Sequence, residues 1–134
     1  MVKRSSTAAL WATLLLAASP AVAQCPRGSL TGTVTYVRDG DTIEVGSMAI
    51  RFWGVAAPEW DAPGGQEATD AITALVLDKE IRCELTGKQT YDRCVGICYL
   101  NGMNVEAELV RQGLARDCPR FSGGAATATP SRRR

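Results

Sequence analysis

An acidic turn and a basic strand lie close together in this sequence. Residues 38–42 read Arg-Asp-Gly-Asp-Thr, Arg51 follows within an apolar stretch, and Glu59 comes directly after Pro58. Carboxylates can hold a hard cation, an arginine can neutralise a phosphate, and a glutamate can take a proton from water. The chain has no histidine, so acid–base chemistry near neutral pH must come from other groups. These residue types and spacings predict a site that cuts a phosphodiester.

The elements that would position these residues are mostly strands. Runs of β-branched, aromatic and alternating residues predict five short strands, over residues 31–37, 42–45, 48–53, 80–85 and 93–100. Apolar residues at helical spacing predict two helices, over residues 66–77 and from the N-cap Asn104 through Gln112. Residues 54–65 are rich in Pro and Gly and predict an irregular loop, and Thr86-Gly87-Lys88 predicts the start of a turn.

The order of these elements is β-β-β-α-β-β-α. Three strands in a meander cannot bury two faces alone, so they need a helix or closure into a barrel. Five short strands with a helix between the third and the fourth are the plan of a five-stranded OB-fold barrel. We therefore expect a mainly β fold with two helices, of the α+β class.

The two ends of the chain differ in composition from the middle. Lys3 and Arg4, the apolar run 8–18 and the Ala21-Val22-Ala23 site are typical of a cleaved secretory signal over residues 1–23. The apolar run is shorter than the roughly 20 residues of a membrane-spanning helix, so we expect no membrane span. We then expect residues 24–121 to form one domain that is exported to the periplasm or the medium. Residues 122–134 are small and polar and predict a disordered tail.

The charge of the chain excludes one mode of binding nucleic acid. Without Lys3 and Arg4 of the leader, acidic residues outnumber basic ones by one. A protein that grips nucleic acid by counter-ion release alone is strongly basic. Nucleic acid would therefore be bound at a local site.

Five cysteines remain after the predicted cleavage: Cys25, Cys83, Cys94, Cys98 and Cys118. They contain no C-x-x-C pair, and no histidine is present to complete a zinc site. Disulfides in an oxidising compartment are the better interpretation, and the odd count leaves one thiol over. We expect Cys83 to pair with Cys98, because both lie in apolar runs that should be neighbouring strands. Cys25 and Cys118 are expected to tie together the two ends of the fold.

Five dispersed segments of the chain resemble a known family. They are VRDGDTIEV at 37–45, IRFWGVAAPE at 50–59, QEA at 66–68, TYDRCVG at 90–96 and AELVRQGLA at 107–115. In this order and spacing they resemble the staphylococcal nuclease (thermonuclease) family, over about residues 31–118. The resemblance implies an OB-fold and calcium-dependent cleavage of nucleic acid. The family also contains modules that bind nucleic acid or protein without catalysis.

The resemblance implies a role for each candidate residue. Asp41 resembles the family's calcium-ligating aspartate, and Asp39 resembles the supporting acid of the same turn. Arg51 and Arg93 resemble the two arginines that act on the phosphate. Glu59 resembles the glutamate that orients or deprotonates the attacking water.

Tyr91 and three departures from the family pattern complete the comparison. Tyr91 falls where the family has a tyrosine beside the bound nucleotide. Ala56 stands where the family has a second aspartate ligand, which leaves the backbone carbonyl of Ala57 and predicts weak binding of Ca²⁺. Asp92 stands between Tyr91 and Arg93 where the family has a glycine. Finally, the chain stops before the position of the family's last helix.

Two function classes remain open on the sequence. The first is a monomeric, calcium-dependent nuclease that acts on single-stranded DNA or RNA. The alternative is a degenerate OB-fold module that binds nucleic acid or a protein without cleavage. Ala56 favours this alternative, whereas the retained Arg51, Glu59 and Arg93 favour the enzyme. A structural module of an envelope complex is a third, less supported interpretation.

Overall fold

The structure is a computed structural model that describes residues 24–122. The predicted leader lies outside the described residues, as does the predicted tail apart from Ser122, which ends a helix and is not disordered as expected. The strands are β1 (Arg27–Asp39), β2 (Thr42–Val45), β3 (Met48–Phe52), β4 (Val55–Ala56), β5 (Glu80–Thr90), β6 (Arg93–Leu100), β7 (Met103–Asn104) and β8 (Arg116–Asp117). The helices are α1 (Gly65–Val76), α2 (Val105–Arg111) and α3 (Pro119–Ser122).

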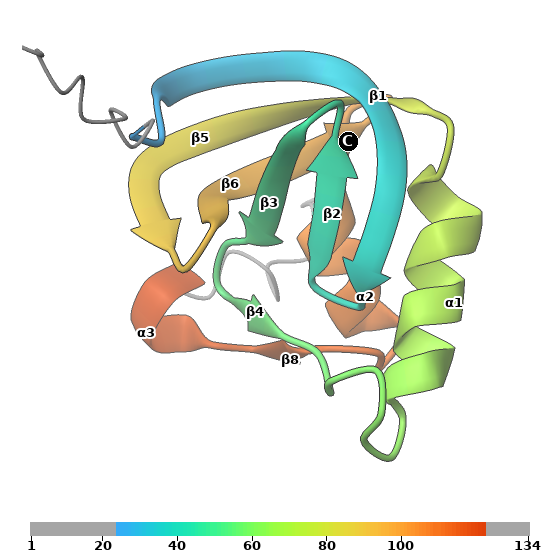
Figure 1. The fold of residues 1–134 in the computed structure, drawn as a ribbon. Helices are drawn as coiled ribbons and strands as arrows, with labels where there is room; N and C mark the ends of the chain where they lie inside the picture. Colours follow the sequence, from blue (N-terminus) through green and yellow to red (C-terminus); the bar gives the residue numbers. More distant parts are fainter. Residues whose placement is uncertain (1–23, 123–134) are drawn as a thin grey trace, which may run out of the picture.

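Five strands close into a barrel. They are hydrogen-bonded in the order β3-β2-β1-β5-β6, and a parallel pairing between β3 and β6 joins the two ends of this sheet. The short β7 extends from β6, while β4 and β8 form a separate two-stranded ribbon. The predicted five-stranded OB-fold, mainly β with helices, is confirmed. Closure also places β3 and β6 side by side, although about forty residues separate them in sequence (Figure 1).

The strand β1 is longer than the predicted 31–37 because it has two partners. Its first half pairs with β5 and its second half with β2, and the register shifts after Val34 and again after Val37. Such shifts increase the local twist and let a strand bend. Figure 1 shows β1 curving around the barrel between the two partners. The residues before Thr31 have little strand propensity of their own, so pairing with β5 places them in the strand.

The strand β5 also runs past its predicted end. The turn expected at Thr86-Gly87-Lys88 is wrong, because β5 continues to Thr90 and contains a register shift between Leu85 and Gln89. Gly87 takes a left-handed φ of 78° within this irregularity. The chain instead reverses at Tyr91 and Asp92, directly before Arg93.

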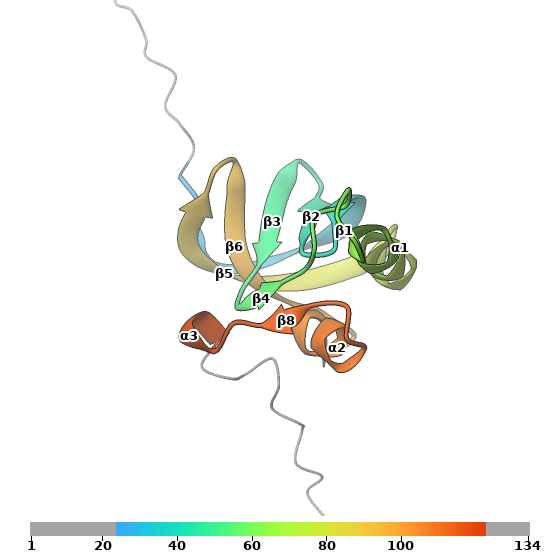
Figure 2. The ribbon, with the colours of Figure 1, turned by 90° about the horizontal axis from the view of Figure 1, so that it is seen from below.

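The helices cover two parts of the barrel (Figures 1 and 2). The helix α1 lies within one residue of its prediction and buries Ala68, Ile72 and Val76 against the core. Asn104 caps α2 as predicted, since its side chain accepts a hydrogen bond from the Ala107 N–H at 2.8 Å. Figure 2 shows α2, β8 and α3 in a row along one side of the barrel.

The sequence did not predict β4, β7, β8 or α3. The irregular loop expected over 54–65 contains β4, which pairs with β8 through Val55–Asp117 and Ala56–Arg116. The ring of Phe121 in α3 meets Trp53 edge to face, with centroids 5.9 Å apart. None of the helices within residues 24–122 has the length and apolar character needed to cross a bilayer.

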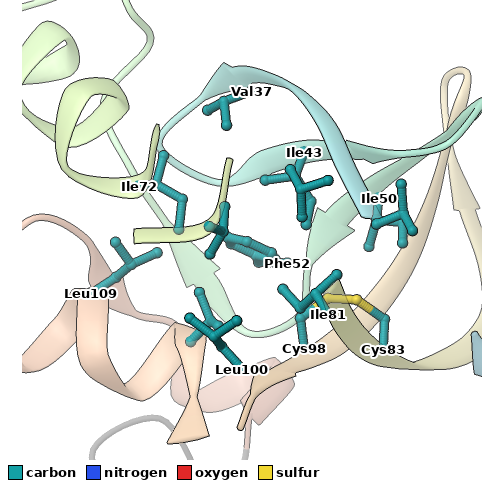
Figure 3. Packing of buried hydrophobic residues seen from close by; sticks show 14 of the residues in the cluster. Val37, Ile43, Ile50, Phe52, Ile72, Ile81, Cys83, Cys98, Leu100 and Leu109 are labelled. Atoms are coloured by element: carbon teal, nitrogen blue, oxygen red, sulfur yellow. A yellow bond between two sulfur atoms is a disulfide. The ribbon is translucent and has the colours of Figure 1, made fainter. Parts of the chain in front are cut away.

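One apolar core fills the barrel. Its largest fully buried side chains include Phe52, Ile43, Ile50, Ile72 and Ile81, which come from three strands and a helix. Figure 3 shows these side chains converging beside the Cys83–Cys98 disulfide. Burying a side chain of this size stabilises a fold by about 1.5–3 kcal/mol before entropy is counted. This core holds in place the strands from which the exposed loops extend.

The structure contains one expected disulfide and one unexpected disulfide. Cys83 and Cys98 stand directly opposite each other in β5 and β6 and are bonded, as the sequence led us to expect. The predicted pair Cys25–Cys118 is wrong, because Cys25 bonds to Cys94 and Cys118 is a half-buried free thiol.

The start of β1 explains this difference. Arg27 pairs with Thr86, so the chain enters the fold beside the hairpin of β5 and β6, where Cys94 lies. Cys118 is elsewhere, and its N–H donates to the Gly54 carbonyl at 2.7 Å. The Cys25–Cys94 bond closes a sequence separation of 69 residues. A loop of that length can stabilise the folded state by about 4 kcal/mol through restriction of the unfolded chain.

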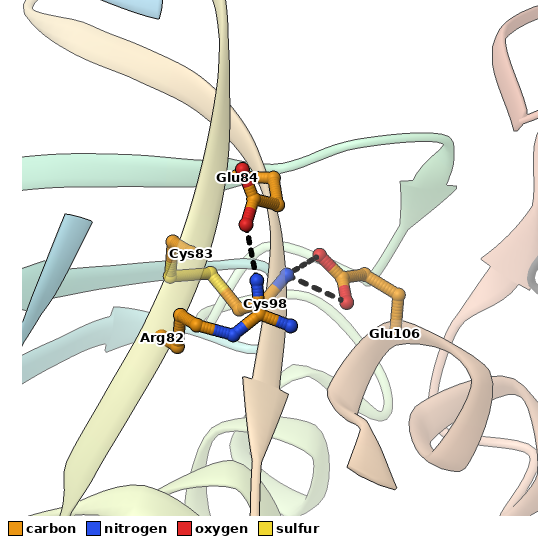
Figure 4. The surroundings of a disulfide bond; sticks show 5 residues. All are labelled: Arg82, Cys83, Glu84, Cys98 and Glu106. Atoms are coloured by element: carbon orange, nitrogen blue, oxygen red, sulfur yellow. Dashed lines mark hydrogen bonds and ion pairs between the residues drawn. A yellow bond between two sulfur atoms is a disulfide. The ribbon is translucent and has the colours of Figure 1, made fainter. Parts of the chain in front are cut away.

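A carboxyl group lies inside the core beside the Cys83–Cys98 disulfide. Glu106 is 1% exposed, and its two oxygens lie 2.9 and 3.2 Å from the Cys98 amide nitrogen, which donates to them (Figure 4). The charged pair Arg82–Glu84 beside it in Figure 4 is on the exposed side of β5. Burial raises the pKa of Glu106 to about 8, so the group is mostly protonated at neutral pH.

We expect Glu106→Gln to change how stability depends on pH. The pKa of Glu106 is higher in the folded chain than in the unfolded chain, so its contribution is complete at about pH 4 and is lost as pH rises through about 8. Glutamine can still accept the Cys98 N–H but does not titrate. Urea unfolding from pH 5 to 9 should show the variant gaining stability over the parent as pH rises. Parallel pH profiles for the two proteins would contradict this assignment.

Candidate active site

The turn between β1 and β2 begins the site. Asp39 Oδ1 accepts a hydrogen bond from the Asp41 N–H at 3.0 Å, which fixes the turn locally. Between them, Gly40 lies so close to its neighbours that a Cβ would stand 2.7 Å from the Ala57 Cβ and 2.8 Å from the Ala68 Cβ. Only glycine lets the turn pack against both the loop after β4 and helix α1.

The carboxylate of Asp41 is the centre of the site. The residue is 7% exposed. Its Oδ2 accepts the Ala57 N–H at 3.1 Å and lies 3.2 Å from Arg51 Nη2, while its Oδ1 accepts the Thr42 hydroxyl at 3.0 Å. Each carboxylate oxygen has two lone pairs, so this group retains capacity to bind a cation.

The surroundings of Asp41 oppose its ionisation. Burial raises the pKa of Asp41 to about 6, the Arg51 guanidinium opposes this rise, and the Asp39 carboxylate adds to it. A nearby positive charge stabilises the ionised form of a buried carboxylate whose pKa is raised. Such a perturbed group is often part of a functional site.

The guanidinium of Arg51 is held rigidly by the backbone around it. Its Nη1 donates to the Phe52 carbonyl at 2.6 Å and to the Val55 carbonyl at 2.8 Å, and its Nη2 faces Asp41. These contacts use some of the five N–H donors of the guanidinium group. The remaining donors can meet an anion without any reorganisation of the side chain.

Arg93, at the start of β6, is linked to Asp41 through Thr42. Its Nη1 donates to Thr42 Oγ1 at 3.1 Å, and its Cζ lies 5.7 Å from the centroid of the Tyr91 ring. Tyr91 is 89% exposed and has a left-handed φ of 54°. The structure therefore joins Arg51, Asp41, Thr42 and Arg93 in one chain of polar contacts.

Asp92 ties the turn before Arg93 to the hairpin that carries Asp41. Arg38 donates to Asp92 Oδ2 at 2.7 Å and to Glu44 Oε1 at 2.8 Å. The bond from Arg38 lowers the pKa of Asp92. The pair is largely exposed, so its contribution to stability is small. Its geometric effect is to join β1 to the turn between β5 and β6.

Glu59 stands apart from the other candidates. It lies in the loop between β4 and α1, its side chain is exposed, and within residues 24–122 the structure gives its carboxylate no hydrogen-bond partner. The loop itself is tight, since the Glu59 carbonyl accepts the Ala62 N–H at 2.9 Å. A Cβ on Gly65 would stand 1.7 Å from that carbonyl oxygen, so glycine is required there.

The acidic groups fit a hard cation only in part. Asp41 offers a buried carboxylate and Asp39 lies in the same turn, while Ala57 meets Asp41 through its N–H. Ala56 contributes no side-chain ligand, and within the described residues no three acidic, cysteine or histidine side chains gather as a metal-binding cluster. A cation here would be held mainly by one carboxylate, with backbone, water and substrate oxygens.

A pocket of about 320 Å³ lies beside this loop. It is lined by Ala56, Ala57 and Pro58 on one side and by residues 113–116, which follow α2, on the other. Its lining residues are mostly small and apolar, and the exposed Arg116 is the charged one among them.

The sequence analysis missed Thr42, which links Asp41 to Arg93. Thr42 directly follows Asp41 in the motif at 37–45, and that adjacency was the available signal. A threonine at the start of a strand is ordinarily explained by strand propensity. Its second role depends on the approach of β6, which the local sequence does not indicate.

We expect Asp41→Asn to stabilise the fold while damaging the site. The folded-state pKa of Asp41 is raised, so its contribution to stability is complete below about pH 4 and is lost as pH rises through about 6. At pH 8 the uncharged variant should exceed the parent by about 1–3 kcal/mol in unfolding free energy. Urea unfolding at pH 4 and pH 8 measures this. A gain of the same size at both pH values would contradict the burial argument.

Comparison with known proteins places this geometry in a family. The chain matches the family described as staphylococcal nuclease homologue over residues 49–127, more than half its length. It is 31% identical over 108 residues to an uncharacterized endonuclease of Haemophilus influenzae, covering 77% of this chain and 61% of that protein. It is 32% identical over 76 residues to a probable staphylococcal-like nuclease, CAN1, of Oryza sativa subsp. japonica, covering 57% of this chain and 23% of that protein.

A third relative covers almost the whole chain. Protein ParB of Escherichia coli is 32% identical over 142 residues, covering 93% of this chain and 77% of that protein. By contrast, the chain spans less than two thirds of the length of the Haemophilus and rice proteins. The matched family and the OB-fold barrel agree, and the chain belongs to the staphylococcal nuclease homologue family.

Proposed function

We propose that this protein is an exported nuclease that hydrolyses phosphodiester bonds of DNA or RNA with the help of calcium. The observation that carries this proposal is the polar chain Arg51–Asp41–Thr42–Arg93 at the junction of β2, β3 and β6. It links two arginines to a single buried carboxylate, Arg51 by direct contact and Arg93 through the Thr42 hydroxyl. The names of the Haemophilus and rice relatives, an endonuclease and a staphylococcal-like nuclease, support the same activity.

The two arginines suit a phosphate that gains charge during hydrolysis. A guanidinium keeps its proton at all relevant pH values and meets two phosphate oxygens at once. Arg51 is fixed by two backbone carbonyls, and Arg93 is fixed by Thr42. Donors that are already oriented cost no reorganisation when the charge develops.

Glu59 is the proposed general base. Its carboxylate is exposed and free of hydrogen-bond partners within the described residues, so it can accept a proton from a water that attacks the phosphate. It follows the Ala57 position by two residues, and the Ala57 N–H is bonded to Asp41. The short segment from Ala57 to Glu59 therefore joins the proposed base to the loop position that is hydrogen-bonded to Asp41.

Calcium is the proposed cofactor, held by Asp41 and the Ala57 carbonyl with Asp39 in support. When bound, the ion would offset negative charge on the phosphate as a Lewis acid. With Ala56 in place of a further carboxylate, we propose weak affinity, in the range of about 10⁻⁴–10⁻³ M found for extracellular sites. The buried charge of Asp41 gains stability from any cation placed there.

The proposed substrate is single-stranded nucleic acid. Aromatic side chains on OB-folds bind unpaired bases by stacking, and Tyr91 exposes most of its ring beside Arg93. The two disulfides support export to an oxidising compartment, the periplasm or the medium. We propose that the protein acts as a monomer.

One observation favours a second candidate function. Because Ala56 leaves the cation with one buried carboxylate, the domain can also be explained as a module that binds nucleic acid or a protein without cutting. The arginines would then serve only to bind phosphate. Cleavage measured beside binding separates the two functions.

We expect Glu59→Gln to abolish cleavage and to leave binding nearly intact. Glutamine keeps the size of the side chain but cannot take a proton, and loss of a general base typically costs about 10²–10⁴ in rate. The assay is cleavage of denatured DNA and of RNA in millimolar CaCl₂, with affinity for a short single strand measured in EGTA. Glu80→Gln is the matched control, since Glu80 is an exposed carboxylate at the start of β5.

The results distinguish the candidates. Cleavage by the parent and by Glu80→Gln, with none by Glu59→Gln, supports the enzyme and the role of Glu59. Cleavage by Glu59→Gln at the parental rate contradicts that role. Binding without any cleavage by the folded, oxidised parent identifies the non-catalytic module instead.

A further inference from the structure

Thr42 has a buried hydroxyl that contacts both halves of the site. The residue is 0% exposed. Its Oγ1 donates to Asp41 Oδ1 at 3.0 Å and accepts from Arg93 Nη1 at 3.1 Å. Asp41 belongs to the turn after β1 and Arg93 begins β6, so one hydroxyl joins two segments about fifty residues apart.

The direction of these two hydrogen bonds is fixed by chemistry. A threonine hydroxyl has one proton to donate and two lone pairs to accept with. A guanidinium has donors only, so the hydroxyl must accept from Arg93. Its single proton is then free to point to the Asp41 carboxylate. Both contacts are charge-assisted, which makes them stronger than bonds between neutral groups.

The backbone of Thr42 is held as firmly as its side chain. Thr42 stands opposite Arg51 in the pairing of β2 with β3. The Phe52 N–H donates to the Asp41 carbonyl at 2.9 Å, which fixes the residue before Thr42. The hydroxyl therefore projects from a rigid part of the barrel.

Arg93 depends on this hydroxyl more than Arg51 does. Arg51 donates to two backbone carbonyls and faces a carboxylate. For Arg93, the described residues provide a single hydrogen-bond partner, Thr42 Oγ1, with the exposed Tyr91 ring 5.7 Å away. Without that partner the guanidinium would be free to turn toward solvent.

We propose that Thr42 is a positioning residue that orients the Arg93 guanidinium toward the reacting phosphate. This inference rests on the proposed nuclease function. Arg93 contacts the substrate, whereas Thr42 acts through Arg93 and sets its orientation before substrate binds. The Thr42 side chain thereby sets the distance between the Asp41 carboxylate and the Arg93 guanidinium.

The kinetic test compares Thr42→Val with Thr42→Ser. Valine keeps the shape and loses the hydroxyl, whereas serine keeps the hydroxyl and loses a methyl group. We expect Thr42→Val to lower kcat by about 10–100-fold, the usual effect of losing a group that orients a reactive one, with a smaller change in KM. Thr42→Ser should restore most of kcat. Thr73→Val is the control, because it removes a threonine hydrogen bond within helix α1.

A double variant tests whether the effect passes through Arg93. In an Arg93→Ala background, Thr42→Val should cost little further rate, because the group it orients is gone. Urea unfolding of each variant separates loss of stability from loss of rate. Full additivity of the two substitutions would overturn the positioning role.

A spectroscopic measurement decides the question without any cleavage. Side-chain ¹⁵N NMR reports rotation about the Arg93 Nε–Cζ bond, and Arg93→Lys identifies the signal. We expect slow rotation in the parent and in Thr42→Ser, and fast rotation in Thr42→Val. Slow rotation in Thr42→Val would overturn the inference even if the parent cleaves. If the parent does not cleave, the proposed function fails, while this comparison still decides whether Thr42 holds Arg93.

Discussion

The buried carboxylate of Asp41 is the constraint on which the site depends. Removing a charge from water is costly unless it is paired and hydrogen-bonded. The structure meets this requirement from three directions, with the Ala57 N–H, the Thr42 hydroxyl and the Arg51 guanidinium. Each of these contacts also fixes a part of the site: the loop that leads to Glu59, the link to Arg93, and the arginine on β3. The remaining rise in the pKa of Asp41 shows that the compensation is incomplete, which leaves a gain available to a bound cation.

The barrel makes this arrangement possible by closing. The parallel pairing of β3 with β6 sets Arg51 opposite Val95, two residues from Arg93, so the strands that carry the two arginines are neighbours only in the closed fold. Gly40 then allows the turn that carries Asp41 to approach the loop after β4 within van der Waals distance. The Cys25–Cys94 disulfide joins the residue after Arg93 in β6 to the segment that precedes β1. Barrel closure, the tight turn and the disulfide therefore position the residues of the site.

Much of the fold could be predicted from local sequence, and the errors have physical causes. The bounds of β2 and β6 were predicted correctly because a turn dipeptide follows each strand, Gly46-Ser47 and Asn101-Gly102. The bounds of α2 were predicted because Asn104 caps it. The bounds of β1 and β5 were not, since each strand is extended by its partner. That extension also explains why Cys25 bonds to Cys94 and not to Cys118. The acidic and basic candidates of the site could be recognised from the sequence motifs. The contact of Thr42 with Arg93 could not, because it depends on β6, which is distant in sequence. The burial of Glu106 was equally hidden, because a glutamate on a helix ordinarily faces solvent.

The most direct test of this account is cleavage of denatured DNA and of RNA by the oxidised protein, in millimolar CaCl₂ and, in parallel, in EGTA. The account predicts cutting in calcium and none in EGTA, because the proposed cation would act at the incompletely compensated charge of Asp41. Equal cutting in EGTA would contradict the role given to Asp41. Absence of cutting in both conditions, from a folded and oxidised sample, would contradict the nuclease itself.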